Sequence, residues 1–140
     1  MLGAEDLAEE LRLAIGRFVR VARAQAGTLP PARAATMGHL SREGPRTIAW
    51  LAARHGVRHQ SMSRIVGELE SLGYVTRAAN PSDARGFVIA LTPGGEAALE
   101  ADRAARRSWV ATAIETRLTP AERAILPAVP ALLDRLAADD

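Results

Sequence analysis

Four polar side chains that can form hydrogen bonds with the edges of bases lie close together near the middle of the chain. They are Gln60, Ser61, Ser63 and Arg64. In the major groove of DNA, Arg and Gln can each form paired hydrogen bonds with guanine or adenine, and Ser can bond to several bases. Their spacing places them on the outward face of a predicted helix, so the chemistry it suggests is the recognition of base sequence. The alternative is an ordinary solvated helix face.

A second candidate group lies in the polar, turn-rich segment 78–86, between two short apolar runs. Arg85 stands near the tip of the hairpin that this pattern predicts, where a basic side chain can enter a minor groove. The alternative is that Arg85 only forms an ion pair with Asp83. Asp83 itself is expected to orient Arg85, or to tie the hairpin to the body of the domain.

Four further basic residues around these two groups are candidates for contacts with DNA phosphates. They are Arg54, Arg58, His59 and Arg77, and the alternative for each is a surface salt bridge. The chain has 18 Arg and no Lys, and its net charge with His neutral is only +2. Residues 46–86 contain six Arg and three acidic residues, a local charge of +3, whereas residues 87–140 carry −2. Positive charge therefore accumulates where the candidate contacts lie.

The elements that position these residues are two short helices joined by a tight turn and followed by a hairpin. A helix with Thr47 as its N-cap should end at Gly56, and a second helix should run from about His59 to Leu72. Strands are predicted at 74–77 and 87–91, with a loop at 78–86 between them. Helix-turn-helix and hairpin together form a winged helix.

Helices are expected on both sides of this unit, so the fold class is mainly α with a small β wing. The apolar periodicity predicts helices at about 5–24, 31–42 and 93–117 and a last helix that begins after Thr119-Pro120. Pro127 and Pro130 should break this last helix near Leu126. We expect a winged helix-turn-helix lobe at 28–92 and a helical dimerisation lobe formed by 1–27 and 93–140.

Three segments in this order resemble the MarR family of bacterial regulators. They are Leu69-Glu70-Ser71-Leu72-Gly73-Tyr74-Val75-Thr76-Arg77, Asp83-Ala84-Arg85 and Leu91-Thr92-Pro93-Gly94-Gly95. The resemblance implies a homodimer built from the first, fifth and sixth helices, a double-stranded DNA operator with two half-sites, and often a small-molecule effector. One departure is that Arg58 and His59 stand where the family's recognition helix usually opens with Ser or Thr.

An effector crevice could be lined by Phe18, His39 or Trp50, and packing in the core is the alternative for each. No catalytic residues, cofactor or metal site are predicted. The three His residues are not spaced as metal ligands, and no Gly-rich phosphate loop follows a strand. The chain has no Cys, which excludes disulfides and thiol redox sensing.

Composition and hydropathy predict a cytoplasmic protein that does not cross a membrane. No apolar run approaches the roughly 20 residues of a membrane span. Two other classes remain to be weighed. A winged helix that binds only proteins should lack a group of basic residues on its outward face. A small enzyme should contain a pair of residues suited to general acid–base catalysis. The sequence therefore favours a DNA-binding protein, and the resemblance to the MarR family implies a dimeric, effector-responsive repressor.

Overall fold

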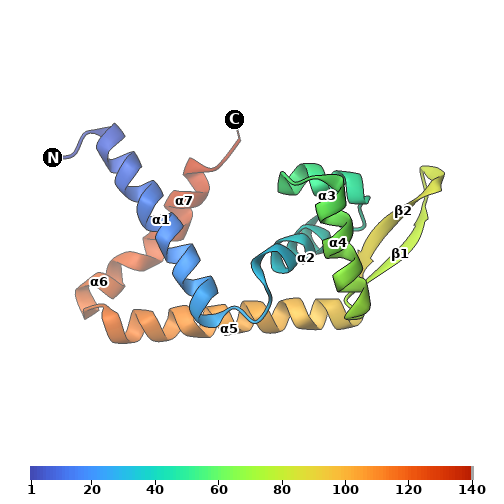
Figure 1. The fold of residues 1–140 in the computed structure, drawn as a ribbon. Helices are drawn as coiled ribbons and strands as arrows, with labels where there is room; N and C mark the ends of the chain where they lie inside the picture. Colours follow the sequence, from blue (N-terminus) through green and yellow to red (C-terminus); the bar gives the residue numbers. More distant parts are fainter. Residues whose placement is uncertain (140) are drawn as a thin grey trace. The chain divides into compact units, whose positions relative to one another are not determined.

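The computed structural model describes residues 1–139, which form helices and one hairpin (Figure 1). The elements are α1 (Ala4–Ala26), α2 (Pro31–Glu43), α3 (Ile48–His55), α4 (His59–Ser71), β1 (Val75–Asn80), β2 (Asp83–Leu91), α5 (Pro93–Arg117), α6 (Pro120–Ile125), a 3₁₀ turn (Leu126–Ala128) and α7 (Val129–Leu136). This order confirms a mainly helical fold with a β wing. No helix within residues 1–139 is both long enough and apolar enough to span a membrane.

The chain forms two compact units, Met1–Arg106 and the segment from Arg107 onward, and α5 passes through the boundary. The first unit includes the early turns of α5 because Leu99 is buried in the core of the winged helix. The boundary between the units thus lies further along α5 than residue 92, where the sequence suggested that the DNA-binding lobe ends. The assignment of separate roles to the two predicted lobes stays a prediction.

The two helices of the helix-turn-helix end where the sequence predicts, because glycine allows the backbone to take a left-handed conformation. Thr47 Oγ1 accepts a hydrogen bond from the backbone N–H of Trp50 at 3.0 Å and so caps the start of α3. Gly56, with φ of 70°, closes α3, and Gly73, with φ of 76°, follows the last residues of α4. These local signals set where α3 begins and where α3 and α4 end.

The wing is a two-stranded antiparallel hairpin that is longer than predicted. The prediction of a loop at 78–86 was wrong, since β1 and β2 pair from Val75↔Leu91 to Ala79↔Phe87 and only Pro81-Ser82 forms the turn. Backbone hydrogen bonds extend this ladder irrespective of side-chain polarity, and turn-forming residues conceal the pairing in the sequence. A register shift after Ala79 leaves a bulge in β2 next to Arg85.

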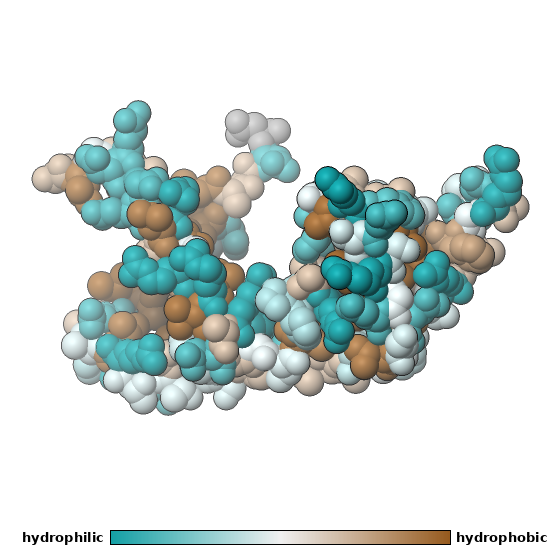
Figure 2. All heavy atoms as spheres, viewed as in Figure 1, coloured by the Kyte–Doolittle hydropathy of each residue, from teal (hydrophilic) through white to brown (hydrophobic). Residues whose placement is uncertain are grey.

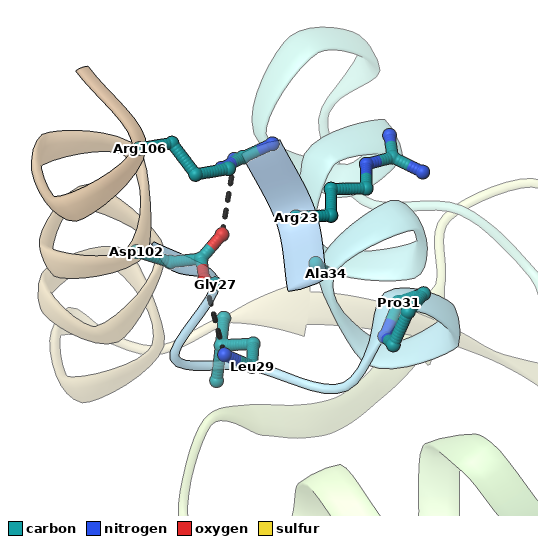
Figure 3. Close-up of a pocket in the computed structure, with 7 residues that line it drawn as sticks. All are labelled: Arg23, Gly27, Leu29, Pro31, Ala34, Asp102 and Arg106. Atoms are coloured by element: carbon teal, nitrogen blue, oxygen red, sulfur yellow. Dashed lines mark hydrogen bonds and ion pairs between the residues drawn. The ribbon is translucent and has the colours of Figure 1, made fainter. Parts of the chain in front are cut away.

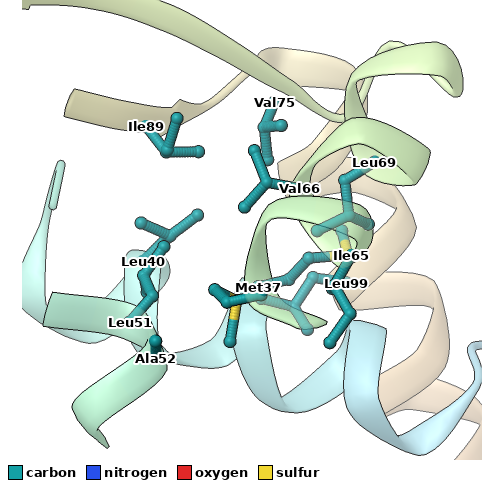
Figure 4. Packing of buried hydrophobic residues seen from close by; sticks show 11 residues of the cluster. Met37, Leu40, Leu51, Ala52, Ile65, Val66, Leu69, Val75, Ile89 and Leu99 are labelled. Carbon is teal, nitrogen blue, oxygen red and sulfur yellow. The ribbon is translucent and has the colours of Figure 1, made fainter. Parts of the chain in front are cut away.

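The core of the first unit joins α2, α3, α4, the base of the hairpin and the start of α5 (Figure 4). Its fully buried side chains include Met37, Leu51, Met62, Leu69, Ile89 and Leu99. The segment before α3 is also attached to the wing, because Arg46 and Ile89 exchange backbone hydrogen bonds at 3.1 and 2.7 Å. Helix α4 and the wing are therefore held by one apolar cluster.

Gly95, at the start of α5, is required by a close approach of two backbone segments. A Cβ atom on this residue would overlap the carbonyl oxygen of Tyr74, whereas at Gly94 it would meet only ordinary contacts. We expect Gly95→Ala to lower the free energy of unfolding by about 1–3 kcal/mol, because the backbone must shift. Gly94→Ala should be neutral or slightly stabilising. Urea titration of both variants measures their free energies of unfolding. Equal values would show that the start of α5 does not pack closely against the backbone of Tyr74.

The second unit contains the predicted break in the last helix. Thr119 and Glu122 form a capping box, with hydrogen bonds of 2.9 and 3.2 Å between the side chain of each and the backbone of the other. The helix stops at Ile125 and continues only after the 3₁₀ turn, as α7. Pro127 and Pro130 lack the N–H groups that a continuous helix would need. The predicted interruption near Leu126 is thus confirmed.

Candidate nucleic-acid interface

The side of α4 that faces away from the core carries the residues predicted to contact bases. Gln60 and Arg64 are exposed and lie one turn apart, whereas Ser61 and Ser63 are half-buried at the flanks of this face. Within residues 1–139 the guanidinium of Arg64 has no ion-pair or hydrogen-bond partner. In Figure 2 the visible surface over α4 is predominantly hydrophilic. Arg64 and Gln60 are therefore available to an external ligand.

The start of α4 is open to an acceptor from outside the chain. Arg58 occupies the N-cap position and makes no capping hydrogen bond with its side chain, and His59 is the first helical residue. Both side chains are exposed. The first N–H groups of a helix need partners and carry a partial positive charge, so a phosphate group can be bound here together with Arg58 or His59.

The wing presents one guanidinium to solvent near its tip. The side chain of Arg85 is 94% exposed, and its Nε lies 3.7 Å from Oδ1 of Asp83. The same Asp83 oxygen accepts a hydrogen bond of 3.0 Å from the backbone N–H of Arg85. Asp83 thereby holds the local backbone of the turn, while the long side chain of Arg85 remains free to extend.

Two of the predicted phosphate contacts lie beside acidic side chains. Arg77 Nε donates a hydrogen bond of 3.0 Å to Glu70 Oε1. Arg54 Nη2 lies 4.0 Å from Oε1 of Glu43. Such surface pairs contribute only about 0–1 kcal/mol, so a phosphate could replace either carboxylate. The contact of these two residues with DNA stays a prediction.

Sequence analysis did not single out Arg46, which lies beside this surface. Its guanidinium stacks over Trp50 at 4.8 Å from the ring centroid and is 3.8 Å from a carboxylate oxygen of Glu43. The buried Nε of Arg46 has no hydrogen-bond partner within residues 1–139. The only signal in the sequence was its place in the basic segment 46–86, directly before the Thr47 cap.

The three residues suggested for an effector crevice do not surround one cavity. His39 and Trp50 are neighbours, with ring centroids 6.3 Å apart, and Trp50 packs against the core. Phe18 is 50% exposed on α1. His39 lines a cavity of about 260 Å³, and neither Phe18 nor Trp50 is among the residues that line it.

This cavity is a cationic cleft formed by the last turn of α1, by α2 and by α5. Its polar lining consists of His39 and four arginines: Arg23, Arg42, Arg103 and Arg106. The rest of the lining is small or aliphatic and comprises Ala34, Ala35, Gly38 and Leu99. Burial lowers the pKa of His39, and the charges of Arg42, Arg54 and His55 lower it further. The sequence could not reveal this cleft, because its arginines come from three distant helices.

A buried carboxylate adjoins the cleft and holds the linker between α1 and α2. Asp102, only 1% exposed, accepts hydrogen bonds from the backbone N–H groups of Thr28 at 2.7 Å and Leu29 at 3.0 Å. Figure 3 shows its contacts with Leu29 and Arg106. Arg106 Nη2 lies 3.0 Å from its other oxygen. Burial tends to raise the pKa of Asp102, but these hydrogen bonds and the charge of Arg106 outweigh burial and lower the pKa. The carboxylate therefore stays ionised near neutral pH.

Comparisons with known proteins identify the family. Residues 28–86, which span the helix-turn-helix and most of the wing, match the sequence model of the MarR family. A helix-turn-helix transcriptional regulator of Mycobacterium tuberculosis is 34% identical over 122 residues, covering 86% of this chain and 85% of that protein. The chain belongs to the MarR family. A regulator of Mycobacterium leprae is 32% identical over 112 residues, covering 79% and 78% of the two chains.

Solved structures show the MarR fold along nearly the whole chain. A transcriptional regulator from Pseudomonas aeruginosa superposes with a TM-score of 0.82 at 29% identity, covering 96% of this chain and 95% of the other. MarR from E. coli, in its apo form, gives a TM-score of 0.70 at 20% identity and covers 99% of both chains. The predicted winged-helix architecture is thereby confirmed.

This MarR-family protein leaves apolar side chains exposed on helices of both units. Although α1 has 23 residues, Ala22 is its only buried residue, and Leu7, Ile15 and Phe18 are exposed. In the second unit, Ile125, Leu132 and Leu136 are exposed. Figure 2 shows hydrophobic residues at the surface of these helices. Apolar side chains that gather at the surface in this way are typical of sites that contact another molecule.

Proposed function

We propose that this MarR-family protein is a transcriptional repressor that binds double-stranded DNA as a homodimer and is released by a small-molecule effector. The observation that carries the proposal is the presence of two exposed guanidinium groups on the winged helix. Arg64 projects from the outward face of α4, and Arg85 is almost fully exposed near the tip of the wing. A winged helix that binds only proteins would have little need for this outward basic set.

The two arginines are assigned different roles in the complex. Arg64, with Gln60, enters the major groove, where a guanidinium can form two hydrogen bonds with guanine. Arg85 enters the adjacent minor groove, because the negative potential of a narrow minor groove attracts Arg side chains. Arg58, His59 and the open start of α4 bind phosphates, which fix the register of the helix on the duplex.

A second copy of the chain is the proposed partner of the apolar face of α1. A helix of 23 residues with one buried side chain gains little from packing within its own unit, which supports burial of its apolar stripe by another chain. The apolar residues of α6 and α7 are proposed to join the same interface. A two-fold dimer presents two recognition helices to one face of the DNA, so the operator should contain two half-sites. We expect the protein to act in the cytoplasm, where such an operator is accessible.

The decisive experiment selects bound fragments from a genomic DNA pool with the purified full-length protein. The expected result is an enriched motif with two related half-sites about one helical turn apart, roughly 10 base pairs from centre to centre. Binding should weaken steeply as salt is raised, because phosphate contacts release counterions. Recovery of fragments without any shared sequence would contradict the proposal and favour a protein-binding winged helix.

A further inference from the structure

We propose that Asp102 is a positioning residue for DNA binding: by holding the linker between α1 and α2, it fixes the distance between the two recognition helices of the dimer and so the half-site spacing that the protein accepts. This inference rests on the proposed function, since it requires a dimer that uses α1 and binds two half-sites. All the groups involved lie in the unit Met1–Arg106.

Packing in the core does not by itself hold α1 at one angle to the winged helix. Only Ala22, close to the end of α1, is buried, and no residue of α1 belongs to the apolar cluster around Met37 and Leu99. A helix of 23 residues is about 35 Å long. A rotation of about 10° at its last turn would therefore move its first turn by roughly 6 Å, which exceeds the rise of one base pair, about 3.4 Å.

The linker that follows α1 is short, and its backbone is bound to one carboxylate oxygen. Gly27 ends α1, and Pro31 is the first residue of α2. Between them, Oδ1 of Asp102 accepts hydrogen bonds from the N–H groups of both Thr28 and Leu29 and one of 3.2 Å from Oγ1 of Thr28. Hydrogen bonds to an ionised acceptor are stronger than those between neutral groups. This set of contacts, the Asp102 anchor, ties the end of α1 to α5.

The burial of Asp102 indicates that its charge serves this contact. Aspartate is rarely buried unless it has partners, because taking a charge out of water costs free energy. Here Arg106, one turn further along α5, places Nη2 3.0 Å from the second carboxylate oxygen (Figure 3). An apolar side chain could fill the same space but could not accept the N–H groups of the linker. The residue is therefore explained by the segment that it holds.

In the proposed dimer, the angle of α1 determines where each winged helix lies. Each copy meets its partner through the apolar stripe of α1, and α4 belongs to the same unit on the other side of the linker. With the anchor in place, the two recognition helices meet half-sites at one spacing. Without it, the linker can adopt several conformations, so the dimer fits several spacings and loses more conformational entropy in each complex.

The first test follows the linker without DNA, by hydrogen exchange of the Thr28 and Leu29 amides, detected by NMR in the full-length protein. In Asp102→Asn both amides should exchange roughly tenfold to a hundredfold faster, because the hydrogen bonds that protect them lose their charged acceptor. The matched control is Glu96→Gln, which removes the same charge from an exposed position on α5 and should leave both rates unchanged. Unchanged exchange in Asp102→Asn would overturn the anchor.

The second test compares the selected operator with duplexes in which one base pair is inserted or removed between the half-sites. Wild-type protein should bind the altered duplexes at least roughly tenfold more weakly, since one base pair shifts a half-site by about 3.4 Å and rotates it by about 35°. In Asp102→Asn this ratio should shrink by a factor of about three or more, while affinity for the original operator decreases. A purely structural loss of stability would lower all three affinities equally and leave the ratio unchanged.

Circular dichroism and light scattering establish whether Asp102→Asn is a folded dimer. If it does not fold, Arg106→Gln, which removes the counter-charge of Asp102, undergoes the same two measurements, with smaller changes expected in the same direction. A folded variant that is monomeric, or whose spacing ratio equals that of the wild type, would overturn the proposal. Wild-type protein that selects no DNA sequence would refute the proposed function and with it the spacing role, whereas the exchange result would still establish the anchor.

Discussion

Arg64→Ala is expected to reduce binding to the selected operator by about 1–3 kcal/mol, while binding to unrelated DNA falls much less. The reason is the position of Arg64 on the exposed face of α4, one turn into the recognition helix and without an intramolecular partner within residues 1–139. A guanidinium in that place can form paired hydrogen bonds with a guanine edge, and alanine cannot. Discrimination between operator and other sequences should therefore shrink. Fluorescence anisotropy with an operator duplex and with an unrelated duplex measures the two affinities.

Arg85→Ala provides the comparison within the same winged helix. Because Arg85 is proposed to enter the minor groove near phosphates, its loss should weaken binding to all sequences more evenly. The slope of log affinity against log salt should decrease by about one phosphate equivalent. If both substitutions left operator affinity and salt dependence unchanged, the surface formed by α4 and the wing would not be the DNA-binding surface.

Phe18→Asp should convert the dimer into monomers and weaken operator binding by a factor of about 10²–10⁴. Phe18 is half-exposed in the single chain and belongs to the apolar stripe of α1. In the proposed dimer an aspartate at this position would be buried without a partner, which costs far more than the hydrophobic contact it replaces. A monomer binds only one half-site, so the increase in affinity that comes from binding two half-sites at once is lost. Light scattering and DNA titration measure the two effects.

Arg20→Asp is the control for this substitution. It places the same acidic side chain two positions further along, nearly opposite Phe18 around the helix axis, and it changes the net charge more. The dimer and its operator affinity should be largely retained. A monomeric wild-type protein at micromolar concentration, or a Phe18→Asp variant that remains dimeric, would contradict the assignment of α1 to the interface.

Much of the fold could be predicted because its signals act over a few residues. The Thr47 cap, the left-handed glycines Gly56 and Gly73, and the capping box at Thr119 all involve hydrogen bonds between near neighbours in the chain. The break before α7 is equally local, since each proline removes its own N–H. The exposure of Arg64 also follows from helical periodicity, once the apolar residues of α4 are assigned to the core.

The rest depended on how the elements pack. The wing is longer than its sequence indicates because cross-strand pairing is a property of two segments together. Asp102 anchors Thr28 across 74 positions of sequence, and the arginines of the cleft converge from α1, α2 and α5. The apolar periodicity of one helix predicts which of its faces is buried, but it does not predict which face of another helix packs against it. That geometry is set by the apolar core around Leu99 and Met37. The candidate DNA contacts could therefore be proposed from the sequence, whereas the cationic cleft and the Asp102 anchor of the α1–α2 linker were decided by tertiary structure.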